Sequence, residues 1–153
     1  MRGGAPRRRA GGQRRGMPAL PVHRGSCLCA RVRYEVSGRL GTFDTCHCTD
    51  CRKSHAAAFA AYIMVAQRDF RFVRGAAHLT THAAPTGTKR SFCRRCGSIV
   101  TCWNDDDRVY TWITASTLDT PITITPAYHT YVRSKASWYD LEDSRPRFET
   151  SRS

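Results

Sequence analysis

The chain has 153 residues, of which 41% are hydrophobic, 10% aromatic and 24% charged, and its formal net charge is +13. This length suits one domain, and the spread of aliphatic and aromatic residues excludes collagen, coiled coils and wholesale disorder. The longest apolar run, residues 56–66, is well short of the ~18–20 residues that span a bilayer. We therefore expect a single soluble domain with no membrane partner.

The positive charge is concentrated near the N-terminus. Residues 1–16 contain six arginines and no acidic residue, which leaves a formal charge of +7 for the rest of the chain. Segment 1–22 is rich in Arg and Gly and has no apolar period, so we expect it to be disordered, with Met17 as an alternative translation start. It also lacks the apolar stretch of a secretory signal, which favours a cytoplasmic protein. Nucleic acid is not an expected partner, except through the 1–16 arm.

The rest of the chain predicts a mostly β domain. Apolar and polar residues alternate clearly in 31–36 and 108–114, and no segment sustains the 3.6-residue period of a helix. Residues 104–107 are predicted to form a solvated acidic turn, and residues 116–119 a brief helical turn. In chain order, the predicted strands are residues 31–36, 57–65, 67–74, 79–81, 91–92, 98–103, 108–114 and 129–132.

Seven of the eight cysteines fall into three local groups. The groups are Cys27 with Cys29, the run CHCTDC with Cys46, Cys48 and Cys51, and the run CRRC with Cys93 and Cys96. In a reducing cytosol, clustered cysteines usually bind metal or carry out redox chemistry. A C-x-C pair on a strand places both side chains on one face, and C-x-x-C closes round a tight turn. Each group therefore suits chelation of tetrahedral zinc.

The surroundings of CRRC favour metal binding over redox chemistry. A thioredoxin-type pair lies at a strand-to-helix junction, whereas CRRC is predicted to lie between two strands, with Gly97 ending the turn in a left-handed conformation. Seven ligands cannot fill two closed sites of four, so one site can be structural while the other keeps the open position of a catalytic zinc. Cys102, His47 or His55 could still close the second site, although Cys102 also suits a small core residue and His47 is expected to point away. The spacing leaves the pairing of the groups open.

Four stretches of the chain carry a family resemblance. They are GSCLCARVRYEVSG (25–38), CHCTDCRKSHAAAFAAYIMV (46–65), FCRRCGS (92–98) and YVRSKASWYDLEDSRPRF (131–148). They resemble the glutathione-dependent formaldehyde-activating enzyme (GFA) family, whose domain also occurs in centromere protein V. The resemblance covers residues 23–149 and leaves 150–153 as a frayed tail. It implies a single zinc-stapled β-tent domain of twisted antiparallel sheets.

The resemblance also implies two zinc ions per chain and a pairing of the cysteine groups. Cys27, Cys29, Cys93 and Cys96 would form the closed structural site. Cys46, Cys48 and Cys51 would form an open, catalytic site. Cys102 matches no metal position of the family pattern.

The implied function is that of a zinc-dependent carbon–sulfur lyase, which forms S-(hydroxymethyl)glutathione from glutathione and formaldehyde. Three thiolates leave a zinc site at net −1, so exchange of bound water for an incoming thiol suits it better than strong activation of water. A basic rim would help to dock the carboxylates of glutathione, and the candidate residues are Arg52, Lys53, Arg133 and Lys135. Two alternatives stay open, a lyase for another thiol adduct and a non-enzymatic zinc module that binds protein or chromatin.

Overall fold

The computed structural model describes residues 19–107 and 109–152. Of the segment 1–22 that was predicted to be disordered, residues 1–18 lie outside the described residues, as do the alternative start at Met17 and the 1–16 arm. At its other end the prediction is wrong, because Val22 begins β1 and the Pro21 carbonyl accepts a hydrogen bond from the amide of Gly38 at 2.7 Å. The strands are β1 (Val22–Ser26), β2 (Arg33–Ser37), β3 (Phe43–Cys46), β4 (Ala60–Ala66), β5 (Phe70–Arg74), β6 (Leu79–Ala83), β7 (Thr88–Cys93), β8 (Ile99–Asn104), β9 (Tyr110–Thr114) and β10 (Tyr128–Thr130). The helical elements are α1 (Thr49–His55), η1 (Gln67–Asp69), η2 (Ala76–His78), η3 (Ala115–Thr117) and η4 (Val132–Ser134). None of the described helices is long and apolar enough to cross a membrane.

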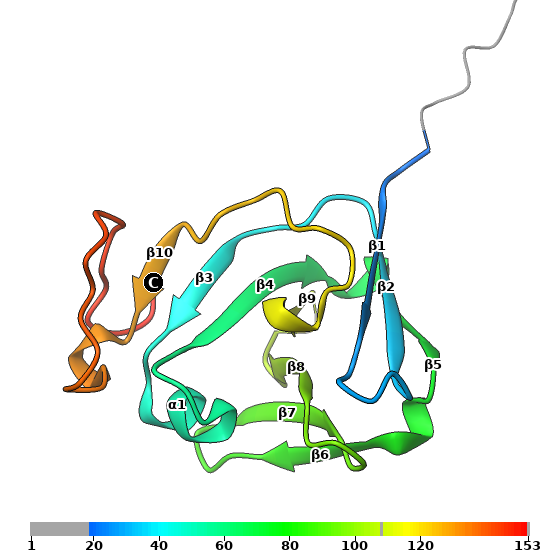
Figure 1. Ribbon diagram of the computed structural model, residues 1–153, viewed down its shortest axis with the longest axis horizontal. Helices are drawn as coiled ribbons and strands as arrows, with labels where there is room; N and C mark the ends of the chain where they lie inside the picture. Colours follow the sequence, from blue (N-terminus) through cyan, green and yellow to red (C-terminus); the bar gives the residue numbers. More distant parts are fainter. Residues whose placement is uncertain (1–18, 108, 153) are drawn as a thin grey trace, which may run out of the picture.

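The strands form two twisted sheets. One has three strands in the order β1-β2-β5, and the other has seven in the order β10-β3-β4-β9-β8-β7-β6. Neighbouring strands are antiparallel, except that β10 runs parallel to β3. Figure 1 shows the large sheet curving from β10 round to β6, with the small sheet standing at one side. The prediction of a mostly β domain with twisted sheets is confirmed.

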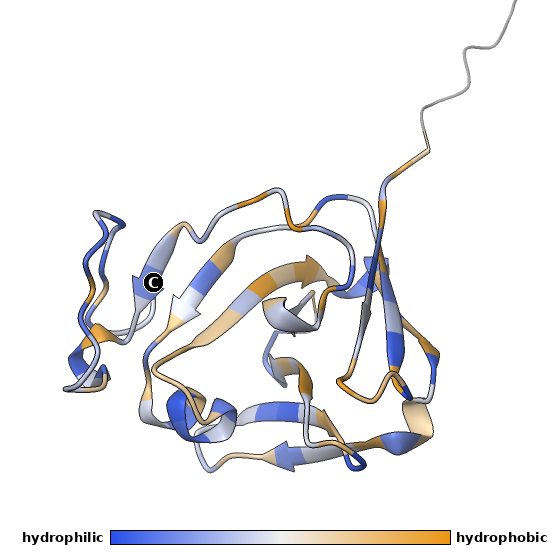
Figure 2. Cartoon of the chain, viewed as in Figure 1, coloured by the Kyte–Doolittle hydropathy of each residue, from blue (hydrophilic) through white to orange (hydrophobic). Residues whose placement is uncertain are grey.

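The main core lies between the two sheets. Alternation along β2 directs Tyr34 and Val36 inward, as predicted, and they meet Ile63 of β4 and Ile113 of β9. Figure 2 shows β4 as one of the more apolar strands, which is expected because it pairs on both sides and is largely covered. Burial of each such side chain contributes roughly 1.5–3 kcal/mol. The core therefore fixes how the small sheet lies on the large one.

The helix α1 was not predicted from the sequence. It has only seven residues, TDCRKSH, of which Cys51 alone is buried, so no apolar period could reveal it. Cys48 caps its N-terminus, and Ala56 ends it in the left-handed conformation at φ +49°. The predicted strand 57–65 consequently begins later, at Ala60. Strands β1 and β3 were also missed, and residues 67–69 form the turn η1 instead of strand.

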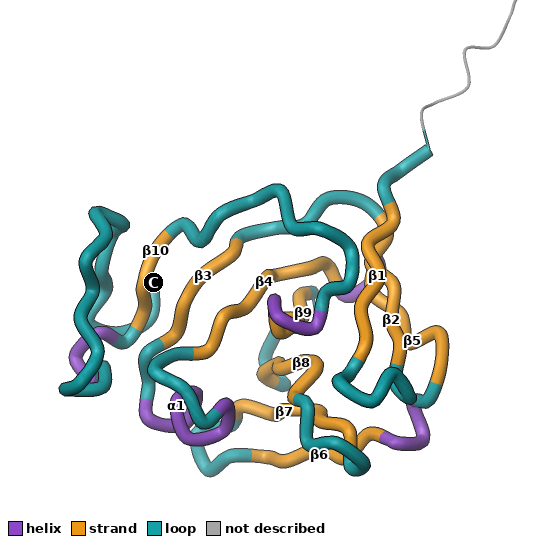
Figure 3. Tube along the Cα trace, viewed as in Figure 1, coloured by secondary structure: helices purple, strands orange, loops and turns teal. Residues whose placement is uncertain are grey.

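The segments on either side of β10 are mostly loop, coloured teal in Figure 3. Residues 150–153 were expected to fray, but the structure holds 150–152 against β10 and its flanks. The Thr150 carbonyl accepts a hydrogen bond from the amide of Tyr131 at 3.0 Å. The guanidinium of Arg152 lies 4.9 Å from the ring centroid of Tyr128. This part of the chain therefore forms a wall beside β3.

Two glycines with positive φ give a test of the fold. At Gly75 (φ +72°) an added Cβ would lie 2.0 Å from the carbonyl oxygen of Arg31, whereas at Gly87 (φ +89°) it would meet nothing within 4 Å. Gly87→Ala should lower the free energy of unfolding by about 1–2 kcal/mol, the cost of the left-handed conformation. Gly75→Ala should add a backbone clash and lower it by about 3 kcal/mol or more. Urea unfolding followed by tryptophan fluorescence measures both, and equal losses would contradict the packing of Gly75 on Arg31.

Candidate functional site

Four cysteine sulfurs meet where two turns come together. Cys27 and Cys29 lie in the turn between β1 and β2, Cys93 ends β7, and Cys96 lies in the turn between β7 and β8. Their Sγ atoms all lie within 4.8 Å of one another. The Cys27–Cys29 and Cys29–Cys93 Sγ distances are 3.6 and 3.9 Å, close to the ~3.8 Å between sulfurs of a tetrahedral zinc site. This four-sulfur cluster links the small sheet to the large one.

Backbone hydrogen bonds hold the two turns of the four-sulfur cluster in place. Gly97 has φ +77°, which confirms the predicted left-handed residue, and its amide donates to the Cys93 carbonyl at 2.8 Å. The amide of Val32 donates to the Cys27 sulfur at 3.3 Å, and that of Leu28 donates to the hydroxyl of Ser98 at 3.0 Å. CRRC lies between two strands, as predicted, but Cys27 and Cys29 lie in a turn and not on a strand.

A second cluster contains three sulfurs. Cys46 ends β3, Cys48 caps α1 and Cys51 lies in the first turn of that helix. Their Sγ atoms lie within 4.8 Å of one another, and the amide of Cys51 donates to the Cys48 sulfur at 3.3 Å. Cys46 and Cys51 are buried, and Cys48 is half-buried. The short helix is therefore what turns the chain back and brings Cys51 to the other two.

The three-sulfur cluster opens into the largest of the described cavities, which has a volume of about 960 Å³ and is lined by all three of its cysteines. Ligand sites in proteins commonly measure about 300–1,000 Å³. Other walls come from β3, β4, β7 and β9, with Asp44, Tyr62, Arg90 and Trp112, and from the C-terminal segment, with Arg133. Burial raises the pKa of Asp44 to about 6. The space is large enough for a molecule of tripeptide size.

Neither His47 nor His55 joins the three-sulfur cluster, and Cys102 does not join it either. His47 is fully buried, and its Nε2 lies 2.9 Å from Nδ1 of His129. Burial, together with the nearby His129, lowers the pKa of His47 to about 4. The Nε2 of His55 lies 2.8 Å from the hydroxyl of Tyr62, and Cys102 packs as a buried side chain beside Cys46 and Cys51. Within the described residues, this cluster thus offers three protein ligands.

The donor set of the three-sulfur cluster fits a soft divalent cation. Hydrogen bonds with Cys48 and Cys51 raise the pKa of Cys46 far above the ordinary thiol value, and burial adds to this. Three sulfurs so close together can all ionise only when a cation offsets their mutual repulsion. Thiolate is a preferred ligand of zinc. Both clusters can therefore hold a metal, and zinc suits their chemistry.

Sequence reasoning missed Arg90, which lies beside the three-sulfur cluster. Its side chain is buried in β7, at 4% exposure, and its Nη2 donates to the Cys51 sulfur at 3.5 Å. Arg90 and Ser91 are both buried, because the register shifts between Ser91 and Phe92 where β7 pairs with β8. Such an irregularity breaks the two-residue alternation. No pattern in the sequence could therefore show that Arg90 faces inward.

Of the four basic residues expected at the rim, only one lines the large cavity. Arg133 lines the large cavity, whereas Arg52, Lys53 and Lys135 lie outside its lining. The ammonium group of Lys135 donates to the carbonyl of Tyr139 at 2.8 Å, so it holds the C-terminal segment. The structure instead adds Arg152 to the lining. Arg152 falls in the segment that was expected to fray, so sequence reasoning did not propose it.

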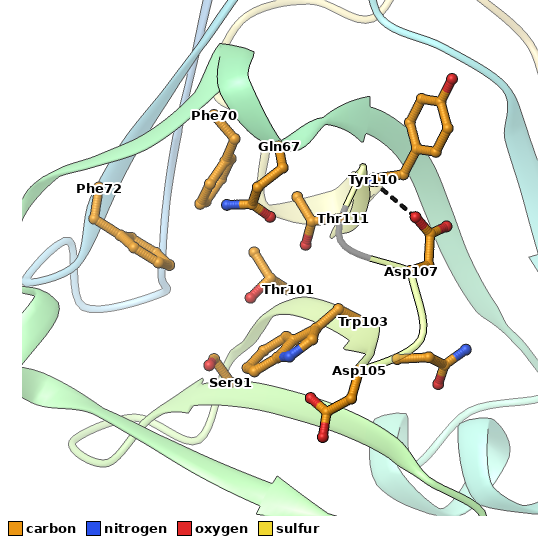
Figure 4. Close-up of a pocket in the computed structure, with 11 residues that line it drawn as sticks. Gln67, Phe70, Phe72, Ser91, Thr101, Trp103, Asp105, Asp107, Tyr110 and Thr111 are labelled. Carbon is orange, nitrogen blue, oxygen red and sulfur yellow. Dashed lines mark hydrogen bonds between the residues drawn. The ribbon is translucent and has the colours of Figure 1, made fainter.

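A smaller cavity of about 390 Å³ lies beside η1, β5, β8 and β9. Figure 4 shows the rings of Phe70, Phe72 and Trp103 around it, with the hydroxyls of Thr101 and Thr111. Its lining contains no cysteine and no basic side chain. It therefore offers no thiolate ligand and no cation for an anionic substrate, and the three-sulfur cavity is the better candidate site.

Comparisons with known proteins agree with this geometry. Residues 22–134 match the family described as glutathione-dependent formaldehyde-activating enzyme. A Halomonas elongata protein named "Putative glutathione-dependent formaldehyde-activating enzyme" is 30% identical over 129 residues, which are 77% of this chain and 80% of that protein. A crystal structure of a Rhodobacter sphaeroides protein, a structural-genomics target, has a TM-score of 0.55 and 27% identity, over 65% of this chain and 91% of the other.

The family match spans both cysteine clusters and most of the two sheets. The Halomonas elongata relative extends the likeness over most of both sequences. On this evidence the chain belongs to the glutathione-dependent formaldehyde-activating enzyme family.

Proposed function

We propose that the protein is a zinc-dependent carbon–sulfur lyase, which joins glutathione to formaldehyde and forms S-(hydroxymethyl)glutathione. The observation that carries this proposal is the unequal division of the cysteines. Four sulfurs join the two sheets, while the other three face a cavity of about 960 Å³. Membership of the family supports the choice of substrates. A lyase for another thiol adduct would use the same site. Comparison of the reaction rates with glutathione and with other thiols distinguishes the two functions.

The two clusters would hold one zinc ion each. In the proposal, the four-sulfur cluster holds a structural ion, and Cys46, Cys48 and Cys51 hold the ion that faces the cavity. Zinc bound there would supply the positive charge that keeps an incoming thiol ionised at neutral pH. His47 and His55 take no part in binding the ion, because each is engaged by another buried side chain.

The reaction is an addition and needs no oxidant or reductant. An electron pair of the thiol sulfur forms the new bond to the carbonyl carbon of formaldehyde. The π pair of the carbonyl moves to its oxygen, which takes up a proton as the thiol loses one. The chain contributes by holding the thiol beside the carbonyl in a half-enclosed cavity, and such positioning is a large part of catalysis in two-substrate reactions.

The substrate carboxylates would be bound at the rim of the cavity. Glutathione has two carboxylates, and Arg133 and Arg152 both line the cavity on the side of the C-terminal segment. A planar guanidinium can form two parallel hydrogen bonds with a carboxylate. We assign this role to Arg133 first, because Arg152 also lies over the ring of Tyr128. Arg52, Lys53 and Lys135 would need the substrate to extend beyond the cavity.

We also propose a reducing compartment, the cytoplasm, as the place of action. All eight cysteines are free thiols in the structure, and disulfides between such close pairs would remove the metal ligands. Reduced cysteine clusters are typical of proteins that stay in the cytosol. Glutathione is itself a thiol of reducing compartments, so substrate and metal site would require the same conditions.

Single replacements of cysteine should separate the two zinc sites. Cys93→Ser should unfold the domain, because a structural zinc supplies folding free energy on the order of 10 kcal/mol. Cys46→Ser should leave the fold largely intact, with one zinc in place of two, and should abolish activity. Metal analysis, circular dichroism and rate measurements check this.

The matched control is Cys102→Ser, which changes a buried cysteine that belongs to neither cluster. It should keep two zinc ions per chain. Equal loss of structure in the Cys46 and Cys93 variants would contradict the division into one catalytic and one structural site.

Replacement of Arg133 tests the docking of the substrate. Arg133→Met should raise the KM for glutathione by about tenfold, the effect of losing one charge-assisted hydrogen bond. The KM for 2-mercaptoethanol, which has no carboxylate, should not change. Arg68→Met, an exposed arginine outside the cavity lining, is the control. Equal effects of Arg133→Met on both thiols would contradict carboxylate binding.

A further inference from the structure

Arg90 presents a buried positive charge with no carboxylate partner. Its side chain is 4% exposed, and none of the ion pairs between described residues includes it. A buried cation is strongly unfavourable unless an anion or several hydrogen bonds compensate it. Nη2 of Arg90 lies 3.5 Å from Sγ of Cys51. Arg90 also bonds to the hydroxyl of Tyr62, but burial raises the pKa of Tyr62, so that partner is neutral. The three-sulfur cluster is thus the counter-charge of Arg90.

Five carboxylates line the same cavity, and four of them have other partners; the half-buried Asp44 is hydrogen-bonded to Thr130. Asp105 pairs with the ammonium group of Lys89, and Asp107 accepts the amides of its own turn. Asp50 accepts a hydrogen bond from the hydroxyl of Thr86 at 3.2 Å. None of the five carboxylates forms an ion pair with Arg90, so they do not replace the cluster as its partner.

The formal charges then balance. Three thiolates and one divalent ion sum to −1, and the guanidinium of Arg90 brings the total to zero. A net charge of −1 would oppose the arrival of another anionic sulfur, and it would also weaken the attraction of the ion for that sulfur. A hydrogen bond from a guanidinium withdraws electron density from the Cys51 sulfur and so acts in the same direction.

We propose that Arg90 is a positioning residue that neutralises the three-sulfur cluster and thereby sets how tightly the site takes a thiolate as its fourth ligand. This rests on the proposed binding of zinc by Cys46, Cys48 and Cys51. In this role Arg90 acts on the cysteine ligands. The alternative role is that Arg90 binds a carboxylate of the substrate. Loss of Arg90 would weaken binding of every thiol in the first case, and only of thiols that carry a carboxylate in the second.

The test uses the full chain with cobalt in place of zinc, because cobalt reports its ligands by absorption. Addition of 2-mercaptoethanol or glutathione changes the absorption spectrum only at a site that exchanges ligands, so the four-sulfur cluster should give no spectral change.

Arg90→Met should weaken the binding of both thiols about tenfold or more, as expected for loss of one nearby charge at an effective dielectric of about 20. The sulfur-to-cobalt band of the thiol-free protein should move to longer wavelength, because the Cys51 sulfur loses its hydrogen bond. Arg90→Lys keeps the charge and should bind both thiols within about threefold of the unaltered protein.

Arg133→Met is the matched control at the same cavity. It should weaken binding of glutathione alone and leave the cobalt band in place. Loss of glutathione binding without loss of 2-mercaptoethanol binding in Arg90→Met would overturn the inference and assign Arg90 to the substrate. An unshifted band in Arg90→Met, or a tenfold loss for both thiols in Arg90→Lys, would also overturn it, since charge would not be the cause. If cobalt does not bind the three-sulfur cluster of the unaltered chain, the proposed function itself is contradicted, and with it the inference about Arg90.

Discussion

The four-sulfur cluster is the contact on which the rest of the molecule depends. Cys27 and Cys29 belong to the turn of the small sheet, and Cys93 and Cys96 to a turn of the large one. A domain of this size is stable by about 5–15 kcal/mol, and a structural zinc contributes on the order of 10 kcal/mol or more. One metal ion between the sheets can therefore decide whether the domain folds. The apolar core lies in the same interface, so packing and a bound metal ion would support the same arrangement.

The three-sulfur cluster is built differently, because its backbone comes from a different part of the fold. A strand end and the first turn of a seven-residue helix supply its ligands, and both lie on the large sheet or beside it. Among the described residues no fourth cysteine joins these three, although Cys102 packs nearby. The surroundings are polar and charged, with Arg90 in contact with Cys51 and Arg133 in the lining of the same cavity. The first cluster closes an interface, whereas the second faces a space that a small molecule can enter.

Much of the fold could be predicted from the sequence, for reasons visible in particular elements. Alternation identified β2 and β9, and the turn chemistry of Gly97 placed CRRC between two strands. The helix α1 could not be found in this way, because its seven residues include one buried side chain. Spacing showed that seven cysteines form three groups, and only the family resemblance implied how those groups pair. The grouping of the sulfurs in the structure is the same.

The charged residues of the site were harder to predict than the cysteines. A cysteine pair carries its chelating geometry in its own spacing, so a local pattern is sufficient. An arginine carries no such information, and its direction depends on the local register of its strand. The irregularity between Ser91 and Phe92 accompanies the inward position of Arg90. Likewise the direction of α1 leaves Arg52 and Lys53 outside the cavity lining, although they lie next to Cys51 in the sequence.

The parallel pairing of β10 with β3 has a consequence for the order in which the molecule is assembled. Thr130 lies opposite Cys46 in this pair, and residues up to Arg152 line the space in front of the cluster. The ligands are thus translated early, while the wall that faces them leaves the ribosome about a hundred residues later. During that interval the thiols stand open to any passing metal ion or oxidant. If the cluster holds a metal as proposed, the nascent chain would be most open to binding the wrong ion before its last strand docks.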